Sequence, residues 1–304
     1  MNRQGFEQED PGSILVVGAS GKVGRVLVAK LGEAGYEIIG LDIEPFPGQA
    51  PKHFIQGDVA FPASLKALSD YKFDVLILTI PNGMSEAAVR NIVIPYGRNC
   101  LVVDFLSEKH SFAQLIEREA PDTESVGIHP LFAPSLDWKN QNVLVNPRSV
   151  TSPKALALIR QFEIWGAVVH YCDALEHDQL MGFVQVGIHA ALIAYATVLV
   201  AGKVDFDLLD KVSTPTSRIM WAMLARILGN DPAVYWQIQA SNTAAKDARD
   251  DLLQSLGSLN ELIKTGDRAS FDDTFLKLRN LFGDHLEKYN RLADELFSHK
   301  ISQD

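Results

Sequence analysis

The sequence is poor in cysteine, with only Cys100 and Cys172 in 304 residues, each inside an apolar run. Two such thiols do not form a disulfide-stabilised scaffold and indicate a reducing compartment, so we expect a cytoplasmic protein. Basic residues are also few, because 28 Lys and Arg stand against 38 Asp and Glu and leave a net charge of −10. Binding to a nucleic-acid backbone needs clustered positive charge, so we expect no nucleic-acid partner.

The N-terminus has neither the basic start nor the apolar run of a secretion signal. Residues 1–12 are polar, and we expect them to be a disordered leader. The longest apolar segment, residues 181–202, has the length of a membrane span but contains Gln185 and His189. We interpret it as a buried helix whose polar groups mark a binding site, and we expect no membrane association.

The first third of the chain contains a strand, a glycine-rich turn, a helix, a second strand and an acidic residue. The strand at residues 13–17 leads into Gly18-Ala19-Ser20-Gly21-Lys22-Val23-Gly24, and the second strand ends at Asp42. Glycines in this turn let backbone N–H groups approach a pyrophosphate at the helix N-terminus, and Gly24 allows helix and strand to pack closely. The carboxylate of Asp42 can accept hydrogen bonds from the adenosine ribose and repels a 2′-phosphate, so the pattern predicts NAD binding in preference to NADP.

Strands and helices continue to alternate as far as residue 172, which is typical of a doubly wound, Rossmann-type parallel sheet. A strand at residues 73–79 ends at Ile80-Pro81, a loop that we expect beside the nicotinamide ribose. We expect residues 42–56 to be irregular, and we expect further elements at residues 100–103, 125–128, 142–145, 153–164 and 167–171. The prediction is an NAD-binding domain over residues 13–172.

From residue 173 onward the pattern predicts helices only. Asp205 and Ser270 read as helix N-caps, and glycines at 202, 229, 266 and 283 read as breaks. We therefore predict an all-helical substrate and dimerisation domain over residues 173–304, in which dimerisation is inferred by analogy with other two-part dehydrogenases.

His129 directly follows the apolar strand predicted at residues 125–128, and Pro130 prevents a helix from starting there. The carboxyl ends of strands in an open α/β sheet are where ligands bind. A histidine at this place is held on rigid backbone and titrates near neutral pH, so His129 is a candidate catalytic residue.

Polar residues recur on two helices of the second half. On an ideal helix Gln185 and His189 lie within about 20° of Asp178, one on either side, and the three form either an internal hydrogen-bond network or the wall of a site. Arg218 and Arg226 stand on an otherwise apolar helix and need carboxylate partners. Together with His189 they indicate an anionic substrate, held as a carboxylate. The alternative, which fits Arg218 better than Arg226, is a solvated arginine at a helix end.

These residues together resemble the prephenate dehydrogenase family, specifically its enteric type, over nearly the whole chain. The resemblance is carried by Gly18–Gly24, Ser107-Glu108-Lys109, His129-Pro130-Leu131-Phe132-Ala133-Pro134, Glu176-His177-Asp178-Gln179, His189 and Ser213-Thr214-Pro215 with Arg218 and Arg226. It implies NAD-dependent oxidative decarboxylation of a 1-carboxy-cyclohexa-2,5-diene by a homodimer.

The resemblance also implies roles for single residues. His129 matches the catalytic histidine, and Ser107 matches the serine that hydrogen-bonds it. Further matches imply a substrate-binding set: Arg226, which grips the ring carboxylate, together with His189, His177 and Tyr235. Gln185 and Arg218 complete the expected substrate site.

The sequence departs from the enteric pattern just before the long-helix histidine, where Ile188 replaces a basic residue. We expect no chorismate mutase segment before the nucleotide unit and no regulatory domain after the helices. These departures resemble relatives that act on 4-amino-4-deoxyprephenate, so prephenate and its amino analogue both stay open as substrates.

Two other classes of protein share a glycine-rich turn. Short-chain and extended reductases need a Tyr-x-x-x-Lys pair, and none of the seven tyrosines is followed by lysine four positions on. A non-catalytic NAD-binding regulator would keep the turn and lose the catalytic set, yet Ser107, His129, His189 and Arg226 are all present. No cluster with metal-ligand spacing stands out, and we predict no metal.

Overall fold

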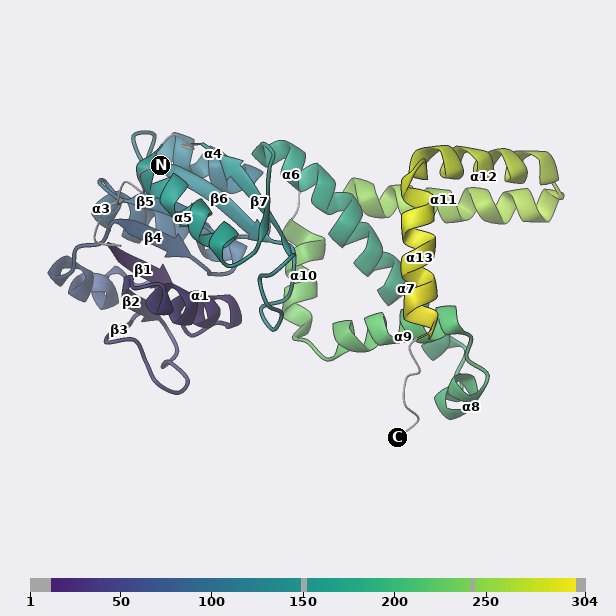
Figure 1. Cartoon of the computed structure of the whole chain (residues 1–304), viewed down its shortest axis with the longest axis horizontal. Helices are drawn as coiled ribbons and strands as arrows, with labels where there is room; N and C mark the ends of the chain where they lie inside the picture. Colours follow the sequence, from purple (N-terminus) through teal and green to yellow (C-terminus); the bar gives the residue numbers. More distant parts are fainter. Residues whose placement is uncertain (1–11, 149–151, 242–243, 299–304) are drawn as a thin grey trace, which may run out of the picture. The chain divides into compact units, whose positions relative to one another are not determined.

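A computed structural model of the chain describes residues 12–148, 152–241 and 244–298 (Figure 1). Nearly all of the expected leader, residues 1–11, lies outside them. The chain divides into two compact units between Leu180 and Met181. The sequence-based boundary after residue 172 falls a few residues earlier and stays a prediction.

The first unit is built on one eight-stranded sheet with the order β3-β2-β1-β4-β5-β6-β7-β8. All neighbouring strands are parallel except β6 and β7, which are antiparallel. The strands are β1 (Ser13–Val17), β2 (Glu37–Asp42), β3 (His53–Gln56), β4 (Val75–Leu78), β5 (Leu101–Asp104), β6 (Ser125–Pro130), β7 (Asn142–Pro147) and β8 (Val168–Tyr171). The expected Rossmann-type fold is confirmed.

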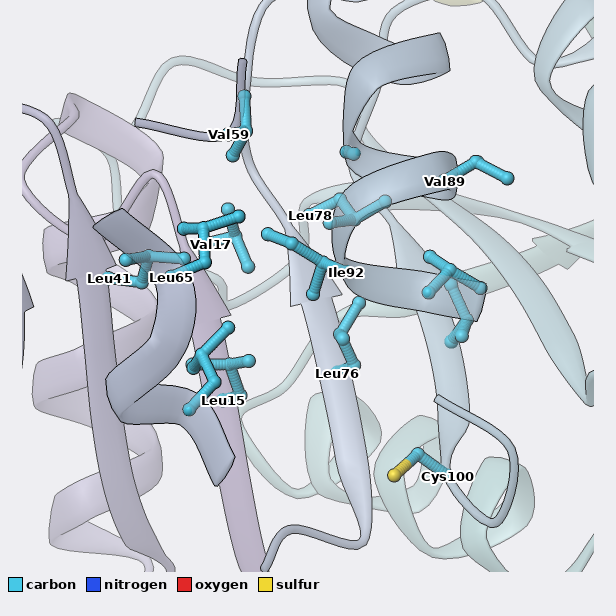
Figure 2. Packing of buried hydrophobic residues seen from close by; sticks show 14 of the residues in the cluster. Leu15, Val17, Leu41, Val59, Leu65, Leu76, Leu78, Val89, Ile92 and Cys100 are labelled. Carbon is cyan, nitrogen blue, oxygen red and sulfur yellow. The ribbon is translucent and has the colours of Figure 1, made fainter. Parts of the chain in front are cut away.

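Helices cover both faces of the sheet, and each face has its own hydrophobic core. Alternate side chains of a strand point to opposite faces, so Leu15 and Val17 belong to one core and Ile14 and Val16 to the other. Figure 2 shows the first core, where Leu65, Val89 and Ile92 from the covering helices meet the strand residues. Its helices are η1 (Pro62–Asp70), the continuous run η2 (Asn82–Met84), α2 (Ser85–Ala88), η3 (Val89–Val93) and α3 (Ile94–Tyr96), and α4 (His110–Glu119). The second core lies under α1 (Lys22–Glu33) and α5 (Pro153–Ile164).

Two details of the sheet differ from the sequence-based expectation. The segment predicted to be irregular contains β3, which adds a parallel edge strand beside β2. Strand β6 continues through His129 and Pro130, because β7 runs antiparallel beside it and pairs Leu144 with His129. A strand pairing of this kind depends on residues far apart in the chain, so local pattern could not reveal it.

The second unit is helical from its first residues. Helix α6 (Ala174–Met181) begins in the first unit and continues as the π-helical η4 (Gly182–Gly187) and then α7 (Ile188–Ala201). The remaining helices are α8 (Phe206–Lys211), α9 (Pro215–Leu228), α10 (Pro232–Ser241), α11 (Ala245–Thr265), α12 (Arg268–Phe282) and α13 (His285–Ser298).

Most helix ends follow the expected signals. Asp205 caps α8 by accepting backbone hydrogen bonds, and Gly202, Gly229, Gly266 and Gly283 each end a helix. The N-cap predicted at Ser270 is wrong, since the Asp267 side chain caps α12 by accepting from the Ser270 N–H. The ideal-helix angles predicted for Gln185 and His189 do not apply, because η4 has a π-helical period.

The continuous helix Ala174–Ala201 is long and apolar enough to cross a membrane, with a mean hydropathy of 1.9 in its best window. Only 11% of that window is buried within the chain. Its apolar surface therefore needs a covering that the described residues do not supply, which contradicts the expectation of a helix buried within its own chain.

Candidate active site

The glycine-rich turn after β1 is closed so tightly that side chains cannot replace its hydrogens. Gly18 has φ +85, and a Cβ on Gly24 would lie 2.1 Å from the carbonyl oxygen of Gly18. The N–H groups of Gly18 and Ala19 donate to the carbonyl of Leu41, which ties the turn to β2. Gly21 is the N-cap of α1 and gives it no side-chain hydrogen bond, so a bound anion can take that place. This cradle fits a dinucleotide pyrophosphate.

Asp42 stands at the end of β2 beside the same turn. Its carboxylate accepts the N–H of Ser20 at 2.8 Å and the N–H of Glu44 at 3.0 Å. The Asp42 carboxylate, which we expect to bind the ribose, therefore also supports the turn through the N–H of Ser20. Ile80 packs against the first core, and Pro81 precedes η2 at the end of β4. Roles for these residues, and for Lys22 and Val23 at the start of α1, stay predictions.

His129 owes its position to the alternation of β6. Val126 and Ile128 point into the second core, so Gly127 and His129 point to the opposite face of the sheet. The His129 residue is 8% exposed. A nearly buried imidazole at the end of the sheet can reach a ligand only through the small surface that it keeps.

Three side chains form a hydrogen-bonded chain through His129. Its Nδ1 atom lies 2.8 Å from Nε2 of His177, and Nδ1 of His177 lies 2.8 Å from Oδ1 of Asp178. His177 and Asp178 are fully buried in α6. Both ring nitrogens of His177 are therefore engaged within the protein, which speaks against the direct substrate contact predicted for His177.

The carboxylate of Asp178 lies at the N-terminus of α4. Its Oδ1 accepts the backbone N–H of Lys109 at 2.9 Å, and its Oδ2 accepts that of His110 at 3.0 Å. The N–H groups in the first turn of a helix have no partner within the helix, and this carboxylate supplies acceptors for two of them. Asp178 is thus held as a hydrogen-bond acceptor.

A buried ion pair lies beside this chain. Lys109 donates from Nζ to the Asp104 carboxylate, to the Asp104 carbonyl at 3.0 Å and to the Ile128 carbonyl at 2.9 Å. It thereby joins the end of β5 to the strand that carries His129. Burial lowers the pKa of the Lys109 ammonium and raises the pKa of the Asp104 carboxyl, and the attraction between the two opposes both shifts.

The surroundings of His129 disfavour a positive charge on it. Burial, followed by the nearby charges of His177 and Lys109, holds the pKa of His129 well below the ordinary 6.5. A neutral imidazole that keeps an unoccupied acceptor nitrogen is a base. No residue of the described part of the chain hydrogen-bonds to Nε2 of His129, so this atom is the one that can accept a substrate proton.

Ser107 lies near this region but does not make the expected contact. Its Oγ is 3.4 Å from Nδ2 of Asn82, which can donate to it. Among the described residues no hydrogen bond joins Ser107 to His129. Asn82 follows the Ile80-Pro81 loop, so Ser107 is tied to the predicted nicotinamide side of the site, and its catalytic role stays a prediction.

In the second unit, His189 pairs with Tyr235. Their rings meet edge to face with centroids 5.2 Å apart, and the Tyr235 hydroxyl is 3.3 Å from Nδ2 of Asn230. The Nδ1 atom of His189 is buried without a hydrogen-bond partner among the described residues, and burial lowers the pKa of this histidine. A half-buried imidazole with an unused nitrogen is suited to binding a ligand.

The other predicted substrate residues lie on neighbouring helices of that unit. Arg226 is in the last turn of α9 and is exposed, and the described residues offer neither Arg226 nor Arg218 an ion pair within 4.0 Å. Gln185 is half-buried in η4. An exposed arginine with no protein carboxylate is available to an external anion.

The main feature that sequence reasoning missed is the network of Asp104, Lys109 and Asp178 around His177. Asp104 ends a strand, which was a usable signal. The contact of Asp178 with the α4 N-terminus joins segments 68 and 69 residues apart, which no local pattern indicates. The part of the chain that the structure describes holds no cluster of three metal-ligating side chains.

Comparison with known proteins matches both halves of the chain. Residues 173–277 match the family model described as prephenate dehydrogenase, dimerization domain, and residues 14–93 match that of the NAD dependent epimerase/dehydratase family. A 4-amino-4-deoxyprephenate dehydrogenase of Streptomyces pristinaespiralis is 31% identical over 94% of this chain and 97% of its own length. The T-protein of Enterobacter agglomerans is 28% identical over 95% of this chain and 73% of its own length.

Solved structures agree on the fold. Prephenate dehydrogenase from Aquifex aeolicus has a TM-score of 0.69 with 22% identity, covering 90% of this chain and 99% of that chain. The same enzyme solved with hydroxyphenyl propionate and NAD+ has a TM-score of 0.63 with 21% identity, covering 94% and 99%. The predictions of an NAD-dependent oxidoreductase and of its family are confirmed, and the chain belongs to the prephenate dehydrogenase family.

Proposed function

We propose that this protein catalyses the NAD-dependent oxidative decarboxylation of prephenate to 4-hydroxyphenylpyruvate. The observation that supports it most is the chain of Asp178, His177 and His129, which presents a neutral base at the edge of the unit that carries the glycine cradle. The substrate has a hydroxyl on ring C4 and two carboxylates. The enzyme therefore needs a base that takes the hydroxyl proton and cationic side chains that bind the carboxylates.

The cofactor would be held by the turn from Gly18 to Gly24, with Asp42 on the adenosine ribose. When bound, the nicotinamide accepts a hydride from ring C4. His129 accepts the proton of the C4 hydroxyl at Nε2 as the C4–O bond becomes a carbonyl. Departure of CO2 then leaves its electron pair in the ring, and the proton returns from the imidazole to the resulting phenolate oxygen. His129 thus acts first as base and then as acid.

Arg226 and His189 would bind the two carboxylates of the substrate. Arginine binds a carboxylate in a bidentate manner, and the unpartnered Nδ1 of His189 can add a hydrogen bond. Fixing both carboxylates orients ring C4, and orientation by itself lowers the barrier of the reaction. We propose Tyr235, Gln185 and Arg218 as further parts of this binding surface, with Tyr235 holding the His189 ring.

The second candidate substrate is 4-amino-4-deoxyprephenate. It is favoured by Ile188, an exposed apolar residue where the enteric pattern has a basic one, and by similarity to the Streptomyces pristinaespiralis dehydrogenase over nearly its full length. An amine at C4 is protonated at neutral pH and must lose one proton before the hydride leaves. The same neutral His129 can accept that proton.

The deciding experiment compares kcat/KM for the two substrates by NADH absorbance. We expect turnover of prephenate, and a preference for the amine would instead assign the enzyme to the 4-aminophenylpyruvate reaction. NAD binding without turnover of either compound would contradict the enzyme proposal and favour a non-catalytic NAD-binding regulator.

We further propose that the working form is a homodimer in the cytoplasm. The family model over residues 173–277 describes a dimerization domain, and the second unit exposes large apolar side chains such as Phe183, Val198 and Leu281. A second copy would cover such a surface. Two free, buried thiols are compatible with a reducing compartment. Light scattering that gives the mass of one chain would contradict the dimer.

A further inference from the structure

We propose that the proton taken from the substrate comes to rest on His177, with the Asp178 carboxylate as its counter-ion, and that His129 passes it on. This deepens the proposed function and rests on it. His177 and Asp178 are then positioning residues that act through His129, because they are buried and His129 is the member of the chain with an open acceptor nitrogen.

The hydrogen-bond chain determines where each proton lies. Both oxygens of the Asp178 carboxylate already accept backbone N–H groups, so Nδ1 of His177 is placed to donate to Oδ1. The Nε2 atom of a neutral His177 is then an acceptor. It must receive the Nδ1 proton of His129 across the 2.8 Å that separates them. This leaves Nε2 of His129 as a lone pair, which is the form that a base requires.

The surrounding charges explain why the proton would move from His129 to His177. A cation on His129 would be buried and would lie near the ammonium of Lys109, and both effects lower its pKa. A cation on His177 would touch Asp178 and would attract the Asp104 carboxylate. The charged and titratable groups that surround the pair come from four elements: Asp104 of β5, Glu108, Lys109 and His110 at the start of α4, Cys172 after β8, and Asp178 itself.

The transfer balances in both directions. The substrate O–H bond breaks, its proton binds Nε2 of His129, and the Nδ1 proton of His129 moves to Nε2 of His177. His129 stays neutral in its other tautomer, and His177 becomes an imidazolium beside Asp178. When CO2 leaves, the same two protons move back and the phenolate oxygen is protonated. No oxidant or reductant besides NAD is needed.

Two variants change this chain without removing His129. In Asp178→Asn the side-chain amide can donate to His177, which reverses both tautomers and leaves a proton on Nε2 of His129. In His177→Gln no group can store the proton. We expect each to lower kcat by about 10²-fold or more while the affinity for NAD stays within about threefold. The matched controls are Asp267→Asn, which removes another carboxylate from a helix N-terminus, and His170→Gln, which changes an exposed imidazole on β8.

The pH dependence of kcat distinguishes storage of the proton on His177 from a purely structural role of His177. If His177 stores the proton, its loss leaves the proton on His129, where burial disfavours a positive charge, so the acid limb of kcat in His177→Gln should move down by about one pH unit or more. An acid limb that stays in place or moves up would overturn the proposal, as would a kcat within about threefold of wild type.

Imidazole NMR on the wild-type protein with isotope-labelled histidine tests the tautomers without a substrate and without any variant that could fail to fold. At neutral pH we expect protons on Nδ1 of both His129 and His177. A proton on Nε2 of His129 in the resting protein would overturn the proposal. Because this NMR measurement needs no turnover, it still tests the proposed tautomers if neither candidate substrate is converted.

Discussion

Nε2 of His177 in helix α6 lies 2.8 Å from Nδ1 of His129 in strand β6. The two residues are 48 positions apart in the chain and belong to motifs that look independent in the sequence. Their contact joins the candidate base at a strand end to a buried carboxylate, and we propose that this carboxylate determines the tautomer of the base.

Replacement of His129 by asparagine should lower kcat by about 10² to 10⁴ while NAD binds as before. Asparagine can hydrogen-bond to His177 but cannot take a proton from the substrate. Steady-state kinetics and titration of NAD measure the two effects, with His170→Asn as the control. A His129→Asn enzyme that keeps its kcat would remove His129 from the reaction.

The His177→Gln enzyme should stay active below the pH at which an ordinary histidine loses function. In this variant His129 alone accepts the proton, and burial holds the pKa of His129 well below 6.5, so kcat/KM should begin to fall only at a lower pH.

The same shift affects stability. The unfolded state binds a proton at His129 more readily than the folded state, so this contribution to the free energy of unfolding is complete above pH 6.5 and is lost as the pH falls below it. Thermal unfolding across this range should therefore show a falling Tm. A Tm in His129→Asn with the same dependence as wild type would contradict this assignment.

Arg226→Gln should mainly raise the KM of the cyclohexadiene substrate, by about 10- to 100-fold, with little change in kcat or in the KM for NAD. A hydrogen-bonded charge contributes about 1.5–3 kcal/mol, and about 1.4 kcal/mol corresponds to a factor of ten. Arg218→Gln on the same helix is the comparison, with a smaller effect expected. An unchanged substrate KM in Arg226→Gln would exclude Arg226 from the binding surface.

Gly24→Ala should abolish NAD binding and destabilise the first unit, because the new Cβ would lie 2.1 Å from the Gly18 carbonyl oxygen. Gly257→Ala is the matched control in helix α11, where a Cβ meets nothing within 4 Å. Alanine there should raise stability by about 0.5–1 kcal/mol, because glycine is a poor helix former. Calorimetry and NAD titration compare the stability and the NAD affinity of the two variants. Equal effects of Gly24→Ala and Gly257→Ala would contradict a close-packed turn.

Asp42→Asn should narrow the preference for NAD over NADP, because the substitution removes the charge that repels a 2′-phosphate. Its amide oxygen can still accept the Ser20 N–H, while the hydrogen bond from the Glu44 N–H is lost, so we expect the turn to survive with one support fewer. The ratio of kcat/KM for the two cofactors measures the effect, and an unchanged ratio would place the discrimination elsewhere.

The sequence alone was enough for the plan of the molecule. Apolar strands, the glycine turn from Gly18 to Gly24 and helix-ending glycines are local signals that act within a few residues, and they correctly indicated a Rossmann-type sheet followed by helices. The tight turn itself follows from residue type, since no side chain fits at Gly24. The position of His129 beside Pro130 also marked it as a candidate, and its catalytic role stays a prediction.

The tertiary structure alone decided the surroundings of these residues. Antiparallel β7 extends β6 past His129, and the fold brings Asp178 to the first N–H groups of α4 and His177 to His129. Such contacts depend on how strands pair and helices pack, which is a property of the whole chain and has no local period. Residue type therefore indicated which side chain could act as the base, and packing determined the burial and the hydrogen-bond partner on which its proposed tautomer depends.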